Sequence, residues 1–301
     1  IIINGYNLEN INVQVVKDGQ PLNVSADLIS TSYRQTVVKL TSDSSVPLGF
    51  AQVVVSKANQ PAQSFQIRIA ELNELVTDND TVLLWHLNET TNGSTTVFDS
   101  GGLALHGSAS SSTTAQPGRF GNGRSGSGSI SVTNAFGALN FGASSFTVEG
   151  WFKATASSSN RRLLYLYNSY RGEAMNITLD SSGALSGRVV STGGVNWQVG
   201  MVRTFDPQTG YWSNRFDDNY WHHVALVTDR TANKLRLYVD GVERASADKP
   251  GNFDLLSGVE SSSYPNGFYV DTHLSIITDE VRVSINALSA ERISQSVFGY
   301  D

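Results

Sequence analysis

The sequence predicts an all-β protein that consists of a small β-sandwich followed by a larger jelly roll. Short runs of alternating apolar and polar residues recur along the chain, and tracts rich in Gly, Ser, Thr and Asn separate them. Helical periodicity is confined to Leu288–Ser296, which is enough for about two turns. With 301 residues the chain can build two domains, each with its own core.

Composition limits the chemistry and the partners. The absence of cysteine excludes thiol catalysis and zinc–thiolate sites. A net charge of −6, without any basic run, argues against nucleic acid as a partner. No apolar stretch approaches the roughly 20 residues that a membrane-spanning helix needs, so we expect no membrane insertion.

Charged residues make up only 16% of the chain, and Gly is abundant. This composition is typical of extracellular β proteins, so we expect an extracellular or cell-surface location. The chain begins Ile1-Ile2-Ile3, without Met or a signal peptide, which indicates a part of a longer polypeptide.

Residues 1–72 are predicted to form the small sandwich. Four short apolar runs, separated by turn signals, divide this segment: Ile11–Val15, Val37–Leu40, Val53–Val55 and Phe65–Ile69. The sequences INGYNL (Ile3–Leu8) and VPLGFAQVVVS (Val46–Ser56) resemble the start and the Gly-turn-strand end of an immunoglobulin-like IPT/TIG domain. A generic immunoglobulin-like sandwich is the alternative.

The domain junction is predicted in the polar, acidic sequence ELNELVTDND (Glu71–Asp80), which has no clear period. We expect residues 73–80 to be a linker and residues 81–301 to form the jelly roll. A last strand followed by a loop is the alternative for this segment.

Nine strands can be predicted in the second domain: Val82–Leu87, Ile130–Val132, Phe146–Lys153, Arg162–Tyr167, Met175–Leu179, Val189–Ser191, Trp221–Thr228, Lys234–Val239 and Glu280–Ser284. Trp221–Thr228 is apolar on both faces and should lie in the interior. Lys234–Val239 alternates and is followed by Asp240-Gly241, a pair that favours a hairpin turn.

Seven sequence motifs follow one another in this domain: LLWHLNE (Leu83–Glu89), VFDSGGLALHG (Val97–Gly107), GRFGNGRSGSGSISV (Gly118–Val132), FTVEGWFK (Phe146–Lys153), NYWHHVALVTD (Asn219–Asp229), LRLYVDGV (Leu235–Val242) and TDEVRVSINALSAERI (Thr278–Ile293). In this order they resemble a concanavalin A-like, laminin-G-type jelly roll domain. The resemblance implies a non-catalytic recognition or adhesion module that binds carbohydrate or a cell-surface protein. Two alternatives are an accessory domain of a polysaccharide-degrading enzyme or sialidase, and a structural stalk or tip module of a surface fibre.

The motifs of common enzymes are missing or out of context. Gly121–Gly126 fits GxGxxG, but it leads into a predicted strand and not into the helix that a dinucleotide site requires. Glu149 stands alone, and the adjacent carboxylates of Asp217-Asp218 and Asp279-Glu280 would point to opposite faces of a strand. A GxSxG elbow is absent, and the histidines show no partner pattern. We therefore expect no enzymatic activity.

The long connection Gly193–Asn219 is the predicted ligand site, because exposed rings beside polar groups suit a sugar or peptide. Its candidate residues are Trp197, Arg203, Tyr211, Trp212, Arg215 and Asp217. In the alternative interpretation, these aromatic residues close one end of the sandwich.

The resemblance also implies a structural calcium ion. Asp279 matches the Asp at the start of the DEVRV motif, and the loop Asp99–Gly107 would supply the Asp99 carboxylate and a carbonyl near Gly107. Asn88 stands where many relatives carry an acidic residue. The alternative is that Asp279 holds a turn by hydrogen bonds and that Asp99 forms an Asx-turn with Gly101.

Overall fold

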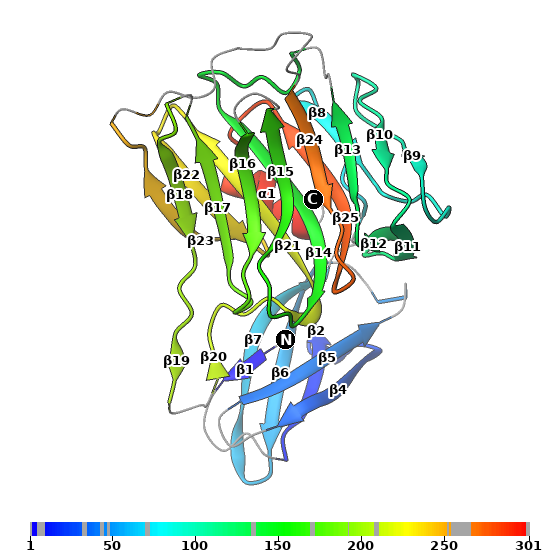
Figure 1. Ribbon diagram of the computed structural model, residues 1–301. Helices are drawn as coiled ribbons and strands as arrows, with labels where there is room; N and C mark the ends of the chain where they lie inside the picture. Colours follow the sequence, from blue (N-terminus) through cyan, green and yellow to red (C-terminus); the bar gives the residue numbers. More distant parts are fainter. Residues whose placement is uncertain are drawn as a thin grey trace. The chain divides into compact units, whose positions relative to one another are not determined.

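The computed structural model in Figure 1 describes residues 2–4, 10–31, 35–42, 45–46, 49–69, 73–133, 137–168, 172–191, 193–207, 211–251, 253 and 266–298. The chain divides into two compact units. Unit 1 comprises Ile1–Leu72 and Asp206–Tyr211, and unit 2 comprises Asn73–Phe205 and Trp212–Asp301. The strand pairs are antiparallel and a single short helix is described, which confirms the predicted all-β class.

Unit 1 contains two antiparallel sheets, with strand orders β1-β5-β4 and β3-β2-β6-β7. The strands are β1 (Ile2–Asn4), β2 (Asn12–Lys17), β3 (Gln20–Pro21), β4 (Val24–Thr31), β5 (Gln35–Ser42), β6 (Gly49–Lys57) and β7 (Gln60–Ile69). Val15 and Val53 are buried, and Val24 and Leu40 of the other sheet pack against this cluster. The immunoglobulin-like assignment stays a prediction, and part of the INGYNL motif lies outside the described residues.

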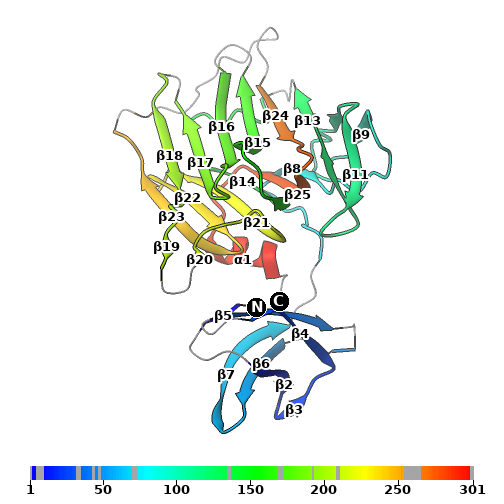
Figure 2. The ribbon, with the colours of Figure 1, turned by 60° about the horizontal axis from the view of Figure 1, so that its bottom comes forward.

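Unit 2 is a sandwich of two sheets, which Figure 2 shows as separate layers. The front sheet has the order β18-β17-β16-β15-β24-β13-β10-β9. Its strands are β9 (Thr95–Val97), β10 (Gly107–Ala109), β13 (Ser129–Thr133), β15 (Arg161–Asn168), β16 (Gly172–Leu179), β17 (Leu185–Val190), β18 (Asn196–Gly200) and β24 (Asn266–Asp271).

The back sheet has the order β11-β12-β25-β14-β21-β22-β23, and β8 also pairs with β25. Its strands are β8 (Thr81–Trp85), β11 (Thr113–Pro117), β12 (Asn122–Gly126), β14 (Phe146–Thr155), β21 (Asp218–Asp229), β22 (Lys234–Val239), β23 (Val242–Asp248) and β25 (Ile276–Ser284). Two short strands, β19 (Phe205–Asp206) and β20 (Tyr211–Trp212), form a separate hairpin.

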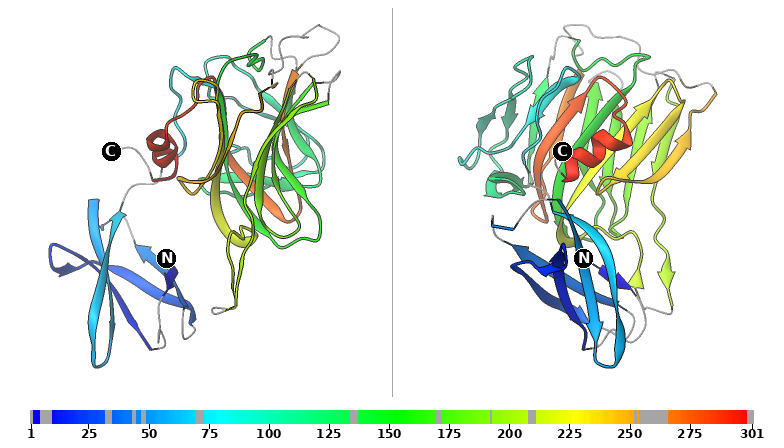
Figure 3. Two further views of the ribbon diagram at one scale, coloured as in Figure 1. Left: turned by 90° about the vertical axis from the view of Figure 1, so that its left-hand side faces the viewer. Right: turned by 180° about the vertical axis from the view of Figure 1, so that it is seen from behind.

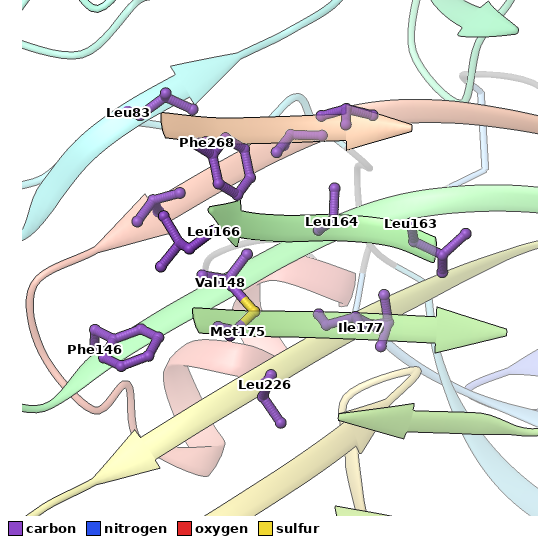
Figure 4. Close-up of a cluster of buried hydrophobic side chains, with 14 of the residues drawn as sticks. Leu83, Phe146, Val148, Leu163, Leu164, Leu166, Met175, Ile177, Leu226 and Phe268 are labelled. Carbon is purple, nitrogen blue, oxygen red and sulfur yellow. The ribbon is translucent and has the colours of Figure 1, made fainter. Parts of the chain in front are cut away.

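The main core lies between the two sheets, and Figure 4 shows part of it. Val148 and Leu226 enter it from the back sheet, and Leu166, Met175 and Phe268 enter it from the front sheet. These positions alternate along their strands with residues that face outward, so strand periodicity directs the packing.

A second, smaller cluster covers the outer face of the back sheet. Ala225 and Val227 of β21 pack with Ile293 of the helix α1 (Ala290–Phe298), which Figure 3 shows against that face. Val224 and Leu226 of the same strand belong to the main core. The prediction that Trp221–Thr228 is covered on both faces is confirmed.

Two local predictions in unit 2 are also confirmed. Helix α1 begins two positions after the predicted start, at Ala290. Asp240 and Gly241 join β22 to β23, with φ values of 52° and 77°. Positive φ at both central residues is the geometry of a type I′ hairpin turn, in which Gly has no steric cost.

Residues 73–80 were expected to be a linker, but they belong to unit 2, and their first part contacts strand β25 of its back sheet. Leu75 is buried, and its N–H donates to Oε2 of Glu280 over 2.7 Å. The carbonyl of Val76 accepts a hydrogen bond from Nη1 of Arg282. The burial of Leu75 and these two hydrogen bonds therefore hold the segment in place, although its sequence is polar and has no strand or helix period.

The GxGxxG match forms a turn and strand β12. Gly121 has a φ of 51°, and Asn122–Gly126 pairs with β11. A Cβ at Gly121 would lie 2.2 Å from Oδ1 of Asn88, so the glycine permits a close approach between two loops. This segment is a strand entry, as expected.

Candidate functional site

The outer face of the front sheet carries aromatic and charged side chains. In β15, Leu164 and Leu166 belong to the core, so Tyr165 and Tyr167 point to the opposite face. In β24, Phe268 and Val270 belong to the core. Tyr269 therefore points outward, and it is the direct register partner of Tyr165.

The strand register extends this pattern across the whole front sheet. One row of register partners crosses all eight strands, and we call it the transverse row: Gln198, Arg188, Asn176, Tyr165, Tyr269, Ser131, Ser108 and Thr96. Every member is polar or a tyrosine. The sheet thus presents a continuous polar and aromatic strip opposite its core face.

Three tyrosines form a platform at the centre of this strip, which we call the tyrosine platform (Tyr165, Tyr167 and Tyr269). The rings of Tyr165 and Tyr269 stack, with centroids 4.9 Å apart and planes 14° apart. Tyr167 meets Tyr269 edge to face at 6.2 Å, and it is 37% exposed. A Cβ at Gly267 would lie 2.7 Å from the ring of Tyr269, so this glycine makes room for the ring.

Charged side chains surround the tyrosine platform. Arg162 donates from Nε to Asp271 over 3.0 Å and from Nη1 to Glu173 over 2.9 Å. Arg188 donates to the same Glu173 over 2.9 Å. The guanidinium carbon of Arg162 lies 4.1 Å from the ring centroid of Tyr165. Two cations and two carboxylates balance one another here, so the surface is polar without a strong net charge.

The hydroxyls of Tyr165 and Tyr269 remain protonated at neutral pH. Burial and the neighbouring Asp271 carboxylate raise the pKa of Tyr165 well above its usual value. Burial, with a smaller effect of Tyr167, also raises the pKa of Tyr269. These groups can donate hydrogen bonds, while Glu173 and Asp271 can accept them. The arrangement is suited to holding a polar ligand with apolar faces.

Trp197, a predicted ligand residue, lies in the core and not at a surface site. It is 1% exposed, its ring packs edge-on against Phe253, and its Nε1–H donates to the carbonyl of Ala247. The physical reason is the alternation of β18, because Trp197 and Val199 face inward while Gln198 faces outward.

The structure brings Arg215 and Asp217 into contact. Nε of Arg215 lies 2.5 Å from Oδ1 of Asp217, and Nη2 of Arg161 lies 3.9 Å from its Oδ2. Asp217 is only 4% exposed. Its carboxylate therefore faces the two arginines and offers almost no surface to a ligand. Arg203 is half-buried on the connection after β18. Tyr211 and Trp212 form β20, and their side chains lie outside the described residues.

The Asp99 carboxylate is occupied by backbone amides. Its Oδ1 accepts hydrogen bonds from Leu84 and Gly101, and its Oδ2 accepts one from Leu105, all over 2.7 to 2.8 Å. The bond to Gly101 is the Asx-turn that formed the alternative prediction. Gly107 lies in β10, where a Cβ would come within 2.7 Å of the Trp85 ring. Close packing against this ring accounts for a glycine at that position.

The Asp279 carboxylate is occupied in the same way. Its Oδ2 accepts hydrogen bonds from the amides of Arg119 and Phe120, and its Oδ1 accepts one from Glu280. Burial, together with the charge of Glu280, raises the pKa of Asp279 to about 7 against the effect of these amides. A calcium ion needs oxygen ligands with lone pairs directed at it. N–H donors take three of the about four lone-pair positions of each carboxylate, so the described hydrogen bonds of Asp99 and Asp279 favour the alternative, in which both side chains hold turns.

Sequence reasoning missed the tyrosine platform and its charged neighbours. The alternation in Arg162–Tyr167 was a signal that two tyrosines share one face. The missing information was the pairing of β15 with β24, which comes from a distant and unpredicted strand.

A family model described as the concanavalin A-like lectin/glucanases superfamily, of the laminin-G type, matches residues 122–294. A comparison with curated protein sequences finds no match. Among the residues that the structure describes, no helix is long and apolar enough to cross a membrane.

Several solved structures share the fold. The binding domain of Paraclostridial Mosquitocidal Protein 1 has a TM-score of 0.57 at 16% identity, over 72% of this chain and 51% of that one. The Botulinum Neurotoxin serotype G binding domain has a TM-score of 0.54 at 10% identity, over 72% and 50%. The binding domain of Botulinum Neurotoxin DC, solved in complex with SialylT, has a TM-score of 0.50 at 14% identity, over 72% and 50%. This chain therefore spans about half the length of these structures.

Proposed function

This chain belongs to the concanavalin A-like lectin/glucanases superfamily, and we propose that it is a non-catalytic, extracellular or cell-surface binding module for a glycan. The tyrosine platform with its charged neighbours on the outer face of the front sheet is the observation that carries this proposal. The fold that the chain shares with several binding domains supports it.

The chemistry of the platform suits a sugar. A pyranose ring presents apolar C–H faces that stack on aromatic rings, and hydroxyls that pair with charged and amide groups. Tyr167 supplies exposed ring surface, and Arg162 and Arg188 have side chains that are 40% and 37% exposed. Strands lie about 4.8 Å apart, so β16, β15 and β24 together span about 10 Å, roughly the length of a disaccharide.

The position of the carboxylates supports a non-catalytic role. Glu149, the isolated acidic candidate, is fully buried on the back sheet and paired with Arg282. On the front face, Glu173 and Asp271 are neutralised by the same arginine. A glycosidase needs two carboxyl groups that are free to act on the glycosidic bond, whereas Glu173 and Asp271 both pair with Arg162.

The test is a glycan array probed with the full chain, followed by titration of each hit. Tyr167→Ala and Tyr269→Ala should each weaken binding by about 1–3 kcal/mol, because stacked aromatic rings dominate such sites. Tyr220→Ala is the matched control, since Tyr220 is 49% exposed on β21 of the back sheet.

Hits that bind both platform variants as tightly as the parent would contradict the proposal. An accessory module of a glycan-degrading enzyme would use the same platform, whereas a purely structural stalk would give no hits.

A further inference from the structure

Three metal-ligating side chains from distant parts of the sequence meet beside the back sheet. Nδ1 of His86, just after β8, lies 2.9 Å and 3.1 Å from the two carboxylate oxygens of Glu280 in β25. Oε2 of Glu74, in the 73–80 segment, lies 3.9 Å from the same Nδ1. Each of the three residues offers one possible ligand atom, and these three atoms all lie within 4.8 Å of one another.

The separation of His86 and Glu280 is close to that of two ligands of one ion. Nitrogen and oxygen ligands about 2.1 Å from a zinc ion lie about 3.0 to 3.4 Å apart, depending on the coordination geometry. The hydrogen-bonded atoms of His86 and Glu280 lie 2.9 Å and 3.1 Å apart, at the lower end of this range, and Glu74 lies farther away at 3.9 Å. Glu74 has a side chain that is 43% exposed, so a small rotation can bring its carboxylate closer.

The charges of the cluster also favour a cation. Glu74 and Glu280 carry two negative charges, and His86 supplies at most one positive charge. Asp279 adds a further carboxylate that acts on His86. Glu280 has a fully buried side chain, and its described cationic partner is His86. A divalent ion would neutralise this excess of negative charge where water is partly excluded.

Hydrogen bonds orient the two carboxylates, and the cluster has an entrance from solvent. The Leu75 amide donates to Oε2 of Glu280, and Nδ2 of Asn88 donates to Oε1 of Glu74 over 2.6 Å. Hydrogen bonds of this kind orient metal ligands and increase affinity. The His86 side chain is 22% exposed, so an ion can reach the cluster from solvent and keep water as a further ligand.

We infer that Glu74, His86 and Glu280 form a binding site for a divalent transition-metal ion, with zinc as the expected occupant. An imidazole with two carboxylates suits zinc, whereas calcium prefers ligand sets made of oxygen alone. Because the three ligands come from the 73–80 segment, the residue after β8 and strand β25, the ion would fasten that segment to the back sheet. This site is separate from the tyrosine platform and does not rest on the proposed function.

The test is calorimetric titration of the untagged full chain with zinc chloride, after treatment with EDTA and its removal. The parent should bind zinc, and its melting temperature should rise by several degrees at saturating zinc, because binding stabilises the folded state. Glu74→Gln and His86→Gln should each weaken zinc binding by at least about tenfold. Glu291→Gln is the matched control, since Glu291 is an exposed acidic residue of α1.

Two further measurements separate a metal site from an ionic contact. Cobalt chloride should give visible absorption bands in the parent that are lost in His86→Gln, and protons should compete with the ion as the pH falls. Glu74→Gln is nearly isosteric and changes a side chain that is 43% exposed, so its melting temperature in EDTA should lie close to that of the parent. Failure of the parent to bind zinc, or zinc affinity that is unchanged in His86→Gln, would overturn the inference.

Discussion

Glu149 and Arg282 form a fully buried ion pair across neighbouring strands of the back sheet. Nε of Arg282 donates to Oε1 of Glu149 over 2.7 Å, neither side chain is exposed, and the two residues are register partners on β14 and β25. Arg282 also donates to Ser296 of α1 and to the carbonyl of Val76. The pair therefore connects the sheet to both segments that cover its outer face.

Glu149→Gln should reduce the free energy of unfolding by about 3–5 kcal/mol, because it leaves the Arg282 guanidinium charged and buried without its partner. Burial opposes ionisation, but Arg282 and His223 lower the pKa of Glu149 to about 2, so the native residue is ionised at neutral pH. Urea denaturation monitored by circular dichroism measures the effect.

Asp248→Asn provides the matched control for that substitution. Asp248 pairs with Lys234 over the same 2.7 Å on neighbouring strands, but its side chain is 83% exposed. Removing an exposed pair should change stability by no more than about 1 kcal/mol. Similar losses in the two variants would show that burial does not determine the contribution of Glu149.

His222 should make stability depend on pH in the alkaline range. Burial lowers the pKa of His222, but hydrogen bonds with the carboxylates of Asp218 and Asp240 outweigh burial and raise it to about 9. Since the folded pKa exceeds the unfolded value of about 6.5, this stabilisation is complete below about pH 6.5 and is lost as the pH rises through 9. The loss should amount to about 3 kcal/mol at most. Unfolding free energies measured between pH 6 and 10 should fall more steeply for the parent than for His222→Gln, and the difference between the two slopes is the contribution of His222.

Local sequence patterns predicted the parts of the fold that depend on local structure. The alternation in Lys234–Val239 and the Asp240-Gly241 pair specified a hairpin, because both signals lie within one supersecondary unit. The double-sided apolar pattern of Trp221–Thr228 likewise indicated an interior strand, since each face had to meet a core of its own.

The tyrosine platform depends on contacts that local patterns do not contain. Tyr165 and Tyr269 become neighbours only when β15 pairs with β24 in one register, and a shift by one residue would turn Tyr269 into the core. The placement of Leu75 against the back sheet similarly depends on Glu280, a residue from the other end of unit 2. Such partners have to be known before either segment can be placed.

Trp197→Ala should destabilise the chain by about 3–5 kcal/mol, because it removes a large ring from the core. Gln198→Ala changes the next residue, which belongs to the transverse row and faces solvent, and it should change stability by less than about 0.5 kcal/mol. Denaturant midpoints of the two variants make the comparison. A stable Trp197→Ala variant that had lost only ligand binding would restore the sequence-based hypothesis for this residue.

Calcium should leave thermal stability unchanged. The Asp99 and Asp279 carboxylates each accept three backbone amides, which take most of the lone pairs that an ion would use. Melting curves in millimolar calcium and in EDTA should therefore coincide, while Asp279→Ala should lower the melting temperature equally in both buffers. A calcium-dependent rise that Asp279→Ala removes would instead support the calcium site implied by the family resemblance.

Gly267→Ala should weaken glycan binding without unfolding the domain. The added Cβ would lie 2.7 Å from Cε2 of the Tyr269 ring and 3.1 Å from both Cζ and the hydroxyl oxygen, so the ring has to move. Because Tyr269 contacts both Tyr165 and Tyr167, its movement should disturb the whole tyrosine platform. The readouts are the affinity for a glycan that Tyr269→Ala has been shown to weaken, and the near-ultraviolet circular dichroism of the tyrosines.

Gly102→Ala is the control, because a Cβ there meets no atom within 4 Å. An altered dichroism spectrum with unchanged glycan affinity would show that the glycan does not depend on the platform, whereas a loss of affinity in Gly267→Ala but not in Gly102→Ala would support binding there.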